Sequence, residues 1–241
     1  MISHKYKCIF IHIPKTAGTS IEALLCDSQD YVDMDKHGHK QALGLNRGEL
    51  KGGLWRQHFT YTELFSNGFS RCCWHREDKK FQLNQQEYQK KYGDADKIIE
   101  QDYFKFAFIR NPLDKLVSEY AWRQYAYKRG TLDIYVSKKA PADFKDFVLH
   151  LENHLSPQDA HVQPQYKFIY DDNHKLQVDY VGRFEELNKE LQEIAELIGA
   201  PFIEVPRLQG SNHDHYKSYY SPELESYVRQ KYKIDFDLGN Y

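Results

Sequence analysis

A short loop of small and hydroxyl-bearing residues follows an apolar run near the start of the chain. The run is Tyr6–Ile13, Pro14–Gly18 breaks it, and Thr19–Cys26 has a helical pattern; residues 14–20 together read PKTAGTS. A strand-to-helix junction presents backbone N–H groups and the positive end of the helix dipole, which together bind anions. Lys15 adds a mobile positive charge. The sequence therefore predicts an anion site here, and the alternative is an ordinary turn with a surface lysine.

A second junction of the same kind lies near the middle of the chain. Phe104–Ile109 has a strand pattern, Arg110-Asn111-Pro112 forms a turn, and a helical period continues to about Lys128. Arg110 at the strand end can donate two parallel N–H groups to a phosphate. Ser118 lies about 9 Å further along the helix axis. We expect both side chains to reach one phosphate; a salt-bridged arginine and a helix-capping serine are the alternatives.

The first loop differs from the phosphate loop of nucleoside triphosphatases. In G-x-x-x-x-G-K-[ST] the lysine follows the last glycine, whereas here Lys15 precedes Gly18 and the first glycine is missing. Paired acidic residues that would hold Mg²⁺ do not stand out either. An ATP or GTP hydrolase is therefore disfavoured.

Histidine is the side chain best suited to accept a proton from a hydroxyl at neutral pH, because its unperturbed pKa is about 6.5. His58 ends a short strand pattern and precedes a helix that begins near Thr60. His39, in His37-Gly-His39, is the competing candidate. A structural histidine at both positions is the third possibility.

Composition excludes several classes of protein. The 241 residues include 33 Lys+Arg and 35 Asp+Glu, for a net charge of −2, which disfavours a general nucleic-acid binder. No run approaches the about 18 apolar residues of a membrane span. The four cysteines form no disulfide pattern and fit a reducing compartment. We expect a cytoplasmic protein without a membrane span.

The chain contains 12 histidines, and histidine is a common metal ligand. The segment Cys72-Cys-Trp-His75 could supply soft ligands together with other histidines. No Cys-x₂-Cys pair is present, and the spacing matches no standard zinc pattern. We therefore predict no metal.

Strand and helix patterns alternate along the rest of the chain. Helical spacing recurs around Phe144–Leu151, Val178–Phe184 has a strand pattern before a helix over 185–198, and Ser221-Pro222 opens a last helix. This alternation predicts an α/β fold with a central parallel sheet and helices on both faces. We expect one domain over residues 1–241. Its polar stretch at about 76–102 is expected to be a solvated helical insertion, or alternatively a lid or acceptor-binding flap.

Two of these segments resemble the cofactor signatures of the sulfotransferases. They are PKTAGTS at 14–20 and FAFIRNPLDKLVSEY at 106–120. The chain is most similar to the carbohydrate (heparan-sulfate 2-O/6-O-like) group and its bacterial relatives. The segments 161–165, 178–185 and 219–223 also resemble this group. The resemblance implies a P-loop-like sulfotransferase fold and the sulfuryl donor PAPS (3′-phosphoadenosine 5′-phosphosulfate), with PAP as product.

The resemblance also assigns residues to the donor. It implies that Arg110 and Ser118 hold the 3′-phosphate. Lys115 departs from the pattern, because many relatives carry arginine there and lysine lacks the bidentate fork. The remaining implied donor residues are Lys15, Thr16, Ala17, Gly18, Thr19 and Ser20 at the 5′-phosphosulfate, and Ser211, Tyr216 and Lys217 in a loop that closes over the nucleotide.

The segment around His58 is similar to the catalytic-histidine segment of the same family, which makes His58 the expected base and Lys15 the residue that stabilises the leaving group. The expected reaction is metal-free sulfation of a hydroxyl on a carbohydrate or glycoconjugate acceptor. Trp55 is expected to stack on a sugar ring. Two alternatives are a small-molecule kinase with a degenerate phosphate loop and a non-catalytic PAP/PAPS-binding protein.

Overall fold

The computed structural model describes residues 2–3, 6–25, 58, 60–62, 100–129, 141–151, 160–201 and 213–241. Its strands are β1 (Ile2–Ser3), β2 (Cys8–Ile11), β3 (Phe104–Ile109) and β4 (Tyr180–Arg183). Its α-helices are α1 (Gly18–Leu25), α6 (Pro112–Arg129), α7 (Phe144–Leu149), α9 (Tyr166–Ile169), α10 (Leu187–Ile198), α11 (Pro222–Lys231) and α12 (Lys233–Gly239). Three short 3₁₀-helices are η1 (Ala160–Val162), η2 (Phe184–Glu186) and η3 (Tyr216–Tyr219).

The described strands form one sheet in the order β1-β2-β3-β4. β2, β3 and β4 run parallel, with Phe10 opposite Phe106 and Phe106 opposite Tyr180, while β1 pairs antiparallel with β2. Parallel strands end at the same edge of a sheet, so the segments after β2, β3 and β4 meet there. Both predicted anion junctions are therefore brought to one edge.

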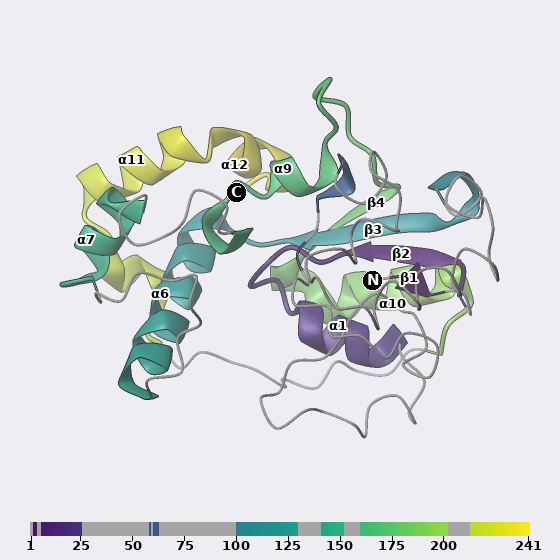
Figure 1. Cartoon of the computed structure of the whole chain (residues 1–241), viewed down its shortest axis with the longest axis horizontal. Helices are drawn as coiled ribbons and strands as arrows, with labels where there is room; N and C mark the ends of the chain where they lie inside the picture. Colours follow the sequence, from purple (N-terminus) through teal and green to yellow (C-terminus); the bar gives the residue numbers. More distant parts are fainter. Residues whose placement is uncertain are drawn as a thin grey trace, which may run out of the picture.

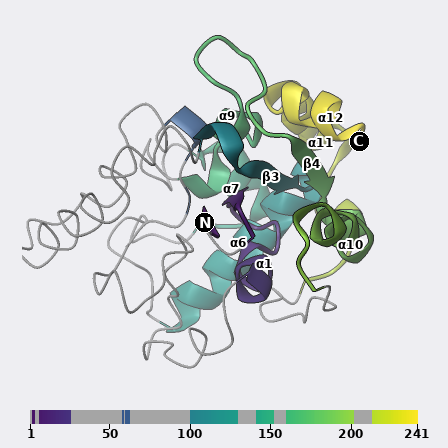
Figure 2. The ribbon, with the colours of Figure 1, turned by 90° about the vertical axis from the view of Figure 1, so that its right-hand side faces the viewer.

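Different helices cover the two faces of the sheet (Figure 1). On one face Ile9, Ile11 and Ile109 pack with Phe168 and Ile169 of α9. The other face carries a second set, which comprises Cys8, Phe10, Phe106 and Phe108 packed with Ile21, Leu25, Leu191 and Ile194 of α1 and α10. The same two layers are visible when the molecule is turned by 90° (Figure 2). The predicted α/β architecture with helices on both faces is confirmed.

Beyond the carboxyl ends of the strands, α6 has its own apolar core (Figure 1). Leu113, Leu116 and Val117 of α6 pack with residues of three further helices: Phe144, Phe147 and Val148 of α7, Leu224 and Val228 of α11, and Phe236 of α12. The N-terminal end of α6 is fixed locally, because Asn111 Oδ1 accepts a hydrogen bond from the Leu113 amide at 3.0 Å. This packing anchors the helix that follows Arg110.

Several predicted boundaries differ from the structure. The strand predicted over Val178–Phe184 spans only Tyr180–Arg183, because η2 begins at Phe184. The helix α12 was not predicted; it begins just after the end of α11, where Tyr232 ends one helix and caps the next. Most of the predicted insertion at 76–102 lies outside the described residues, and its last three, 100–102, are helical.

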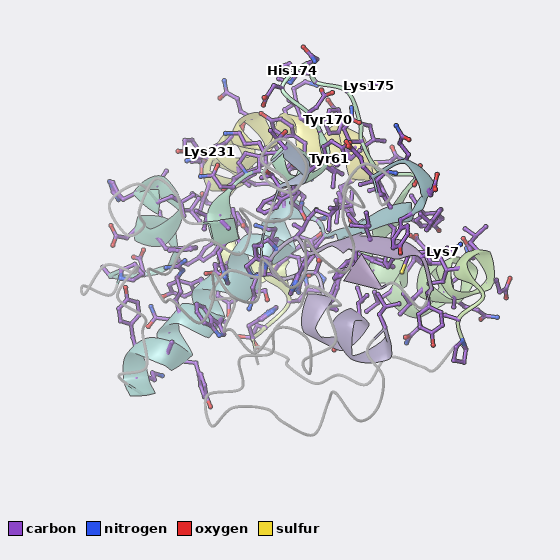
Figure 3. All side chains as sticks on the ribbon, turned by 45° about the vertical axis from the view of Figure 1, so that its right-hand side comes forward. Lys7, Tyr61, Tyr170, His174, Lys175 and Lys231 are labelled. Atoms are coloured by element: carbon purple, nitrogen blue, oxygen red, sulfur yellow. The ribbon has the colours of Figure 1, made fainter. Side chains whose placement is uncertain are left out.

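A loop between α9 and β4 projects away from the sheet (Figure 3). Tyr170 and Leu176 form an antiparallel bridge at its base. Asp171 closes the loop by accepting hydrogen bonds from the amides of Asn173 and Lys175, both at 2.9 Å. The loop is held by its own hydrogen bonds.

The packing around α6 leads to a stability prediction. Phe147 is completely buried, whereas Leu197 on α10 is 63% exposed. Phe147→Ala should lower the free energy of unfolding by about 3–5 kcal/mol, because it removes buried apolar surface and leaves a cavity. Leu197→Ala is the matched control and should change it by less than about 0.5 kcal/mol. Urea unfolding measures both, and equal effects would contradict the described core.

Candidate functional site

The first corner of the site is the tight loop between β2 and α1. Lys15 and Ala17 have positive φ angles of 68° and 64°, a conformation that is uncommon for residues other than glycine. Thr16 is buried, and its hydroxyl donates to the Ile13 carbonyl at 2.8 Å. The hydroxyl of Thr16 therefore holds the loop in shape. The backbone N–H groups at the start of α1 lie immediately after it.

Gly18 is required at the start of α1 by a close approach of the backbone to His12. A Cβ atom at this position would lie 1.9 Å from His12 Nε2. His12 is itself buried and stacks on Phe10, with ring centroids 5.6 Å apart. The predicted helix beginning at Thr19 is thus extended by one residue to Gly18. Ser20 is also buried in this first turn.

The second corner is built around the backbone of Arg110 at the end of β3. The side-chain amide of Gln165 accepts from the Arg110 N–H at 2.9 Å and donates to the Arg110 carbonyl at 2.7 Å. The Asp235 carboxylate in turn accepts from the amides of Gln165, at 2.7 Å, and Tyr166, at 2.9 Å. Arg110 is therefore positioned through α9 by a buried residue of α12.

The side chain of Arg110 joins the two corners. Nη1 donates to the Lys15 carbonyl at 3.0 Å, across 95 residues of sequence. Nε and Nη2 donate to Asp114 at 2.8 and 2.7 Å. Among the described residues, these contacts leave one N–H on each terminal nitrogen for a ligand. Ser118 is buried one turn beyond Asp114 on α6.

Lys115 has a defined place in the structure. Its side chain is only 2% exposed, and Nζ donates to the His161 carbonyl at 2.6 Å. The lysine thus connects α6 to η1.

One ring nitrogen of His58 forms a hydrogen bond with the backbone next to the first corner. Nδ1 is 2.9 Å from the carbonyl oxygen of His12. A carbonyl can only accept, so Nδ1 carries the proton and Nε2 presents a lone pair. Burial lowers the pKa of His58 well below 6.5, and the neighbouring His12 and His161 lower it further. A neutral imidazole with an unprotonated Nε2 is the form required of a general base.

Sequence reasoning missed a histidine and a carboxylate next to His58. The His161 ring meets the His58 ring edge to face, with centroids 4.9 Å apart. His161 Nδ1 donates to Glu119 at 2.9 Å, and Arg123 Nε donates to the same carboxylate at 2.7 Å. The available signal was the spacing of Glu119 and Arg123 on α6; their meeting with His161 depends on the tertiary fold.

Glu119 is the buried negative charge of this cluster. Burial alone would raise its pKa, but His161, Arg123 and Lys15 hold the pKa well below 4.5. For Lys15, burial lowers the pKa, Glu119 raises it, and Arg110 and Arg123 lower it. Lys15 Nζ also lies over the Trp122 ring, 5.5 Å from its centroid. Glu119 thus counters the charges of Arg123 and Lys15, while Asp114 pairs with Arg110.

The structure describes only some of the other residues that the sequence predicted for the site. η3 carries Tyr216 and Lys217 and packs against α6. This segment is joined to α6 by Tyr220, whose hydroxyl donates to the Leu113 carbonyl at 2.9 Å. Tyr216 is half-buried and Lys217 is exposed. Ser211, His39 and Trp55, and the side chain of Thr19, lie outside the described part of the chain.

Two findings concern possible metals and membranes. In the described part of the chain, no group of three or more His, Cys, Asp or Glu side chains is arranged to hold a metal ion. None of the helices over the same residues is long and apolar enough to cross a membrane.

Comparison with known proteins identifies the family. The family model described as "Sulfotransferase family" matches residues 1–241. The chain therefore belongs to the sulfotransferase family, whose members are enzymes that transfer sulfate to an acceptor. The comparisons with curated proteins and with solved structures found no match.

The environment of His58 predicts a pH dependence of stability. In the unfolded chain His58 binds a proton below about pH 6.5, whereas in the folded protein its lowered pKa keeps it neutral. The unfolded state then binds more protons, so stability falls as the pH drops below 6.5, by at most about 1.4 kcal/mol per pH unit. His58→Gln should lose this contribution.

Urea unfolding at pH 7.5 and pH 5.5 measures the effect. The loss of stability between the two values should be smaller in His58→Gln than in the wild type. His150→Gln is the control, because His150 is an exposed histidine at the end of α7. An equal loss in His58→Gln and wild type would show that His58 is not held neutral.

Proposed function

We propose that the protein transfers the sulfuryl group of PAPS to a hydroxyl of a carbohydrate or glycoconjugate acceptor. The observation that carries the proposal is the contact between the two corners, Arg110 Nη1 to the Lys15 carbonyl at 3.0 Å. This contact sets two cationic strand-to-helix junctions side by side. PAPS is a ligand with an anionic group at each end, so it can use one junction for each end.

The Arg110 corner is proposed to bind the 3′-phosphate. Asp114 occupies the Nε side of the guanidinium, and Lys15 holds one hydrogen of Nη1. The two outer N–H groups can then donate in parallel to phosphate oxygens. Ser118, buried on the same side of α6 as Asp114, is placed to add a hydroxyl donor. Tyr216 and Lys217 belong to the segment proposed to close over the nucleotide.

The Lys15 corner is proposed to bind the 5′-phosphosulfate. The backbone amides of residues 15–19 are proposed to surround this group, and α1 contributes the positive end of its dipole. The Ser20 amide already donates to the Ala17 carbonyl at 2.9 Å. As the bond between sulfur and the bridging oxygen breaks, negative charge builds on that oxygen. Lys15 and the loop amides stabilise the charge, and no metal is needed for this step.

His58 is proposed to take the acceptor proton. The acceptor oxygen attacks sulfur, the new S–O bond forms as the bridging S–O bond breaks, and PAP leaves. The hydroxyl proton moves to Nε2 of His58, because Nδ1 is already bonded to the His12 carbonyl. The imidazole then becomes a cation and returns its proton to solvent or product.

The position of the Trp122 ring supports the proposal that the acceptor contains a sugar. Its ring is 38% exposed and stacks on His161, with centroids 5.4 Å apart. Lys15 Nζ lies beside the same ring. An indole next to the base and to the sulfuryl-binding lysine can stack on the apolar face of a pyranose. This role was expected of Trp55, and Trp122 is a second candidate for it.

The two alternative functions are separated by one set of assays. A kinase would release phosphate from ATP and incorporate no sulfate. A non-catalytic binding protein would bind PAP tightly and sulfate no acceptor in a broad panel. Transfer of ³⁵S from labelled PAPS to glycans or glycolipids is the result that supports the proposal.

The Arg110 assignment predicts a binding defect. Arg110→Lys should weaken PAP binding at least about tenfold, because lysine cannot donate the two parallel hydrogen bonds. Isothermal titration calorimetry with PAP measures this. Arg229→Lys is the matched control, since Arg229 also pairs with a carboxylate one turn away, that of Glu225, but is exposed on α11. Unchanged PAP affinity in Arg110→Lys would contradict the assignment.

The His58 assignment predicts a catalytic defect without a binding defect. His58→Ala should lower kcat by about 10²–10⁴ while PAP affinity stays near wild type. Lys15→Ala should reduce kcat most strongly. His150→Ala, at an exposed histidine, should leave kcat unchanged. Near-normal kcat in His58→Ala would exclude His58 as the base and leave His39 as the candidate base.

A further inference from the structure

The residues that hold His161 come from one face of α6. Lys115 Nζ donates to its carbonyl at 2.6 Å, Glu119 accepts from its Nδ1 at 2.9 Å, and Trp122 stacks on its ring. Positions four and three residues apart lie one above another on a helix. One helix face therefore fixes both the backbone and the ring of a histidine that lies in a different segment, η1.

The orientation of His161 places it against the proposed base. Its side chain is 28% exposed, and its ring packs edge to face on His58. On its other side, His58 meets the His12 ring, 4.4 Å between centroids. The His58 ring is thus confined between two other imidazoles, and α6 sets the position of one of them.

Glu119 adds charge to this arrangement. Its carboxylate is completely buried and bonded to both Arg123 and His161. A buried carboxylate is costly unless it is paired and hydrogen-bonded. Both of its oxygens have such partners here. A carboxylate behind a histidine also stabilises an imidazolium cation near it, as in catalytic triads.

We propose that Glu119 and His161 are positioning residues for sulfuryl transfer: together they fix the ring of His58 and supply the negative charge against which it becomes protonated. The inference rests on the proposed function, in which His58 accepts the acceptor proton. It assigns no contact with substrate to either residue. Trp122 and Lys115 support the pair from the same face of α6.

The sign of the pH effect follows from the groups that face one another. Glu119 faces Lys15, Arg123 and His161. His58 also interacts electrostatically with His12, His161 and Glu119, and Lys15 with Glu119, Arg110 and Arg123. Removing the negative charge of Glu119 favours the neutral form of His58 and of Lys15. The pKa values of His58 and Lys15 should therefore both fall.

The first experiment is a titration that does not depend on activity. The ring nitrogens of ¹⁵N-labelled histidine are followed by NMR in wild type and Glu119→Gln, with His58 assigned from His58→Gln. Glutamine keeps the shape of the side chain and removes its charge. The pKa of His58 should fall further below its wild-type value, because the charge of Glu119 raises it. An unchanged value would contradict the electrostatic role.

The second experiment is the pH profile of PAPS-dependent transfer. In Glu119→Gln kcat should fall at least about tenfold, and both limbs of the kcat/KM profile should move to lower pH. Glu119→Asp keeps the charge and should keep both limbs near their wild-type positions. Glu225→Gln, which breaks an exposed glutamate–arginine pair on α11, is the control and should change neither kcat nor the profile.

The outcomes separate this inference from the proposed function. If the wild type transfers no sulfate from PAPS, the proposed function fails whatever the titration shows. If the wild type is active but Glu119→Gln keeps its kcat or its profile, only the inference fails. Should Glu119→Gln not fold because Arg123 is left unpaired, Glu119→Gln combined with Arg123→Met removes that cation. The same fall in the His58 pKa is then expected.

Discussion

Three cationic side chains are held close together in this site, and the carboxylates that balance their charge shape it. Lys15, Arg110 and Arg123 repel one another in a largely buried region, where charge interactions are poorly screened. The chain supplies its own counter-charges from one helix: Asp114 binds Arg110, and Glu119 binds Arg123 while facing Lys15. Because α6 follows Arg110 directly, the strand end that presents the arginine also begins the helix that neutralises it.

The geometry at the end of β3 depends on residues far along the chain. Gln165 satisfies both backbone groups of Arg110, and Asp235 holds Gln165 through its own amide. The neighbouring turn is secured separately, because Glu185 accepts from the Asn111 amide at 2.8 Å and from the Tyr241 hydroxyl at 2.7 Å. The last helix and the last residue therefore support a corner formed more than a hundred positions earlier. Gln165 and Glu185, which make these contacts, lie in the segments 161–165 and 178–185 that resemble the sulfotransferases.

Residues on two sides of α6 contribute to different parts of the site. Asp114 and Ser118, four residues apart, lie on the side of Arg110, whereas Lys115, Glu119 and Trp122 hold His161 beside His58. Membership of the sulfotransferase family gives this arrangement its reaction class. Under the proposed assignment, one side of the helix serves the donor and the other serves the proton acceptor. A rigid helix keeps the two in a fixed relation, which in-line transfer needs.

Local patterns in the sequence were sufficient for the elements and for the first corner. The strand Phe104–Ile109 matched its predicted bounds, and the loop before α1 was recognised from its small residues and Lys15, because period-2 apolar runs and junction chemistry are local signals. The break at Phe184 and the separate helix α12 were missed, since they depend on packing at element ends. By itself, the four-residue spacing of Glu119 and Arg123 indicates no more than an ion pair within one helix. Their meaning came only from the tertiary fold, which brings His161 within 2.9 Å of Glu119 across 42 residues and sets its ring against His58.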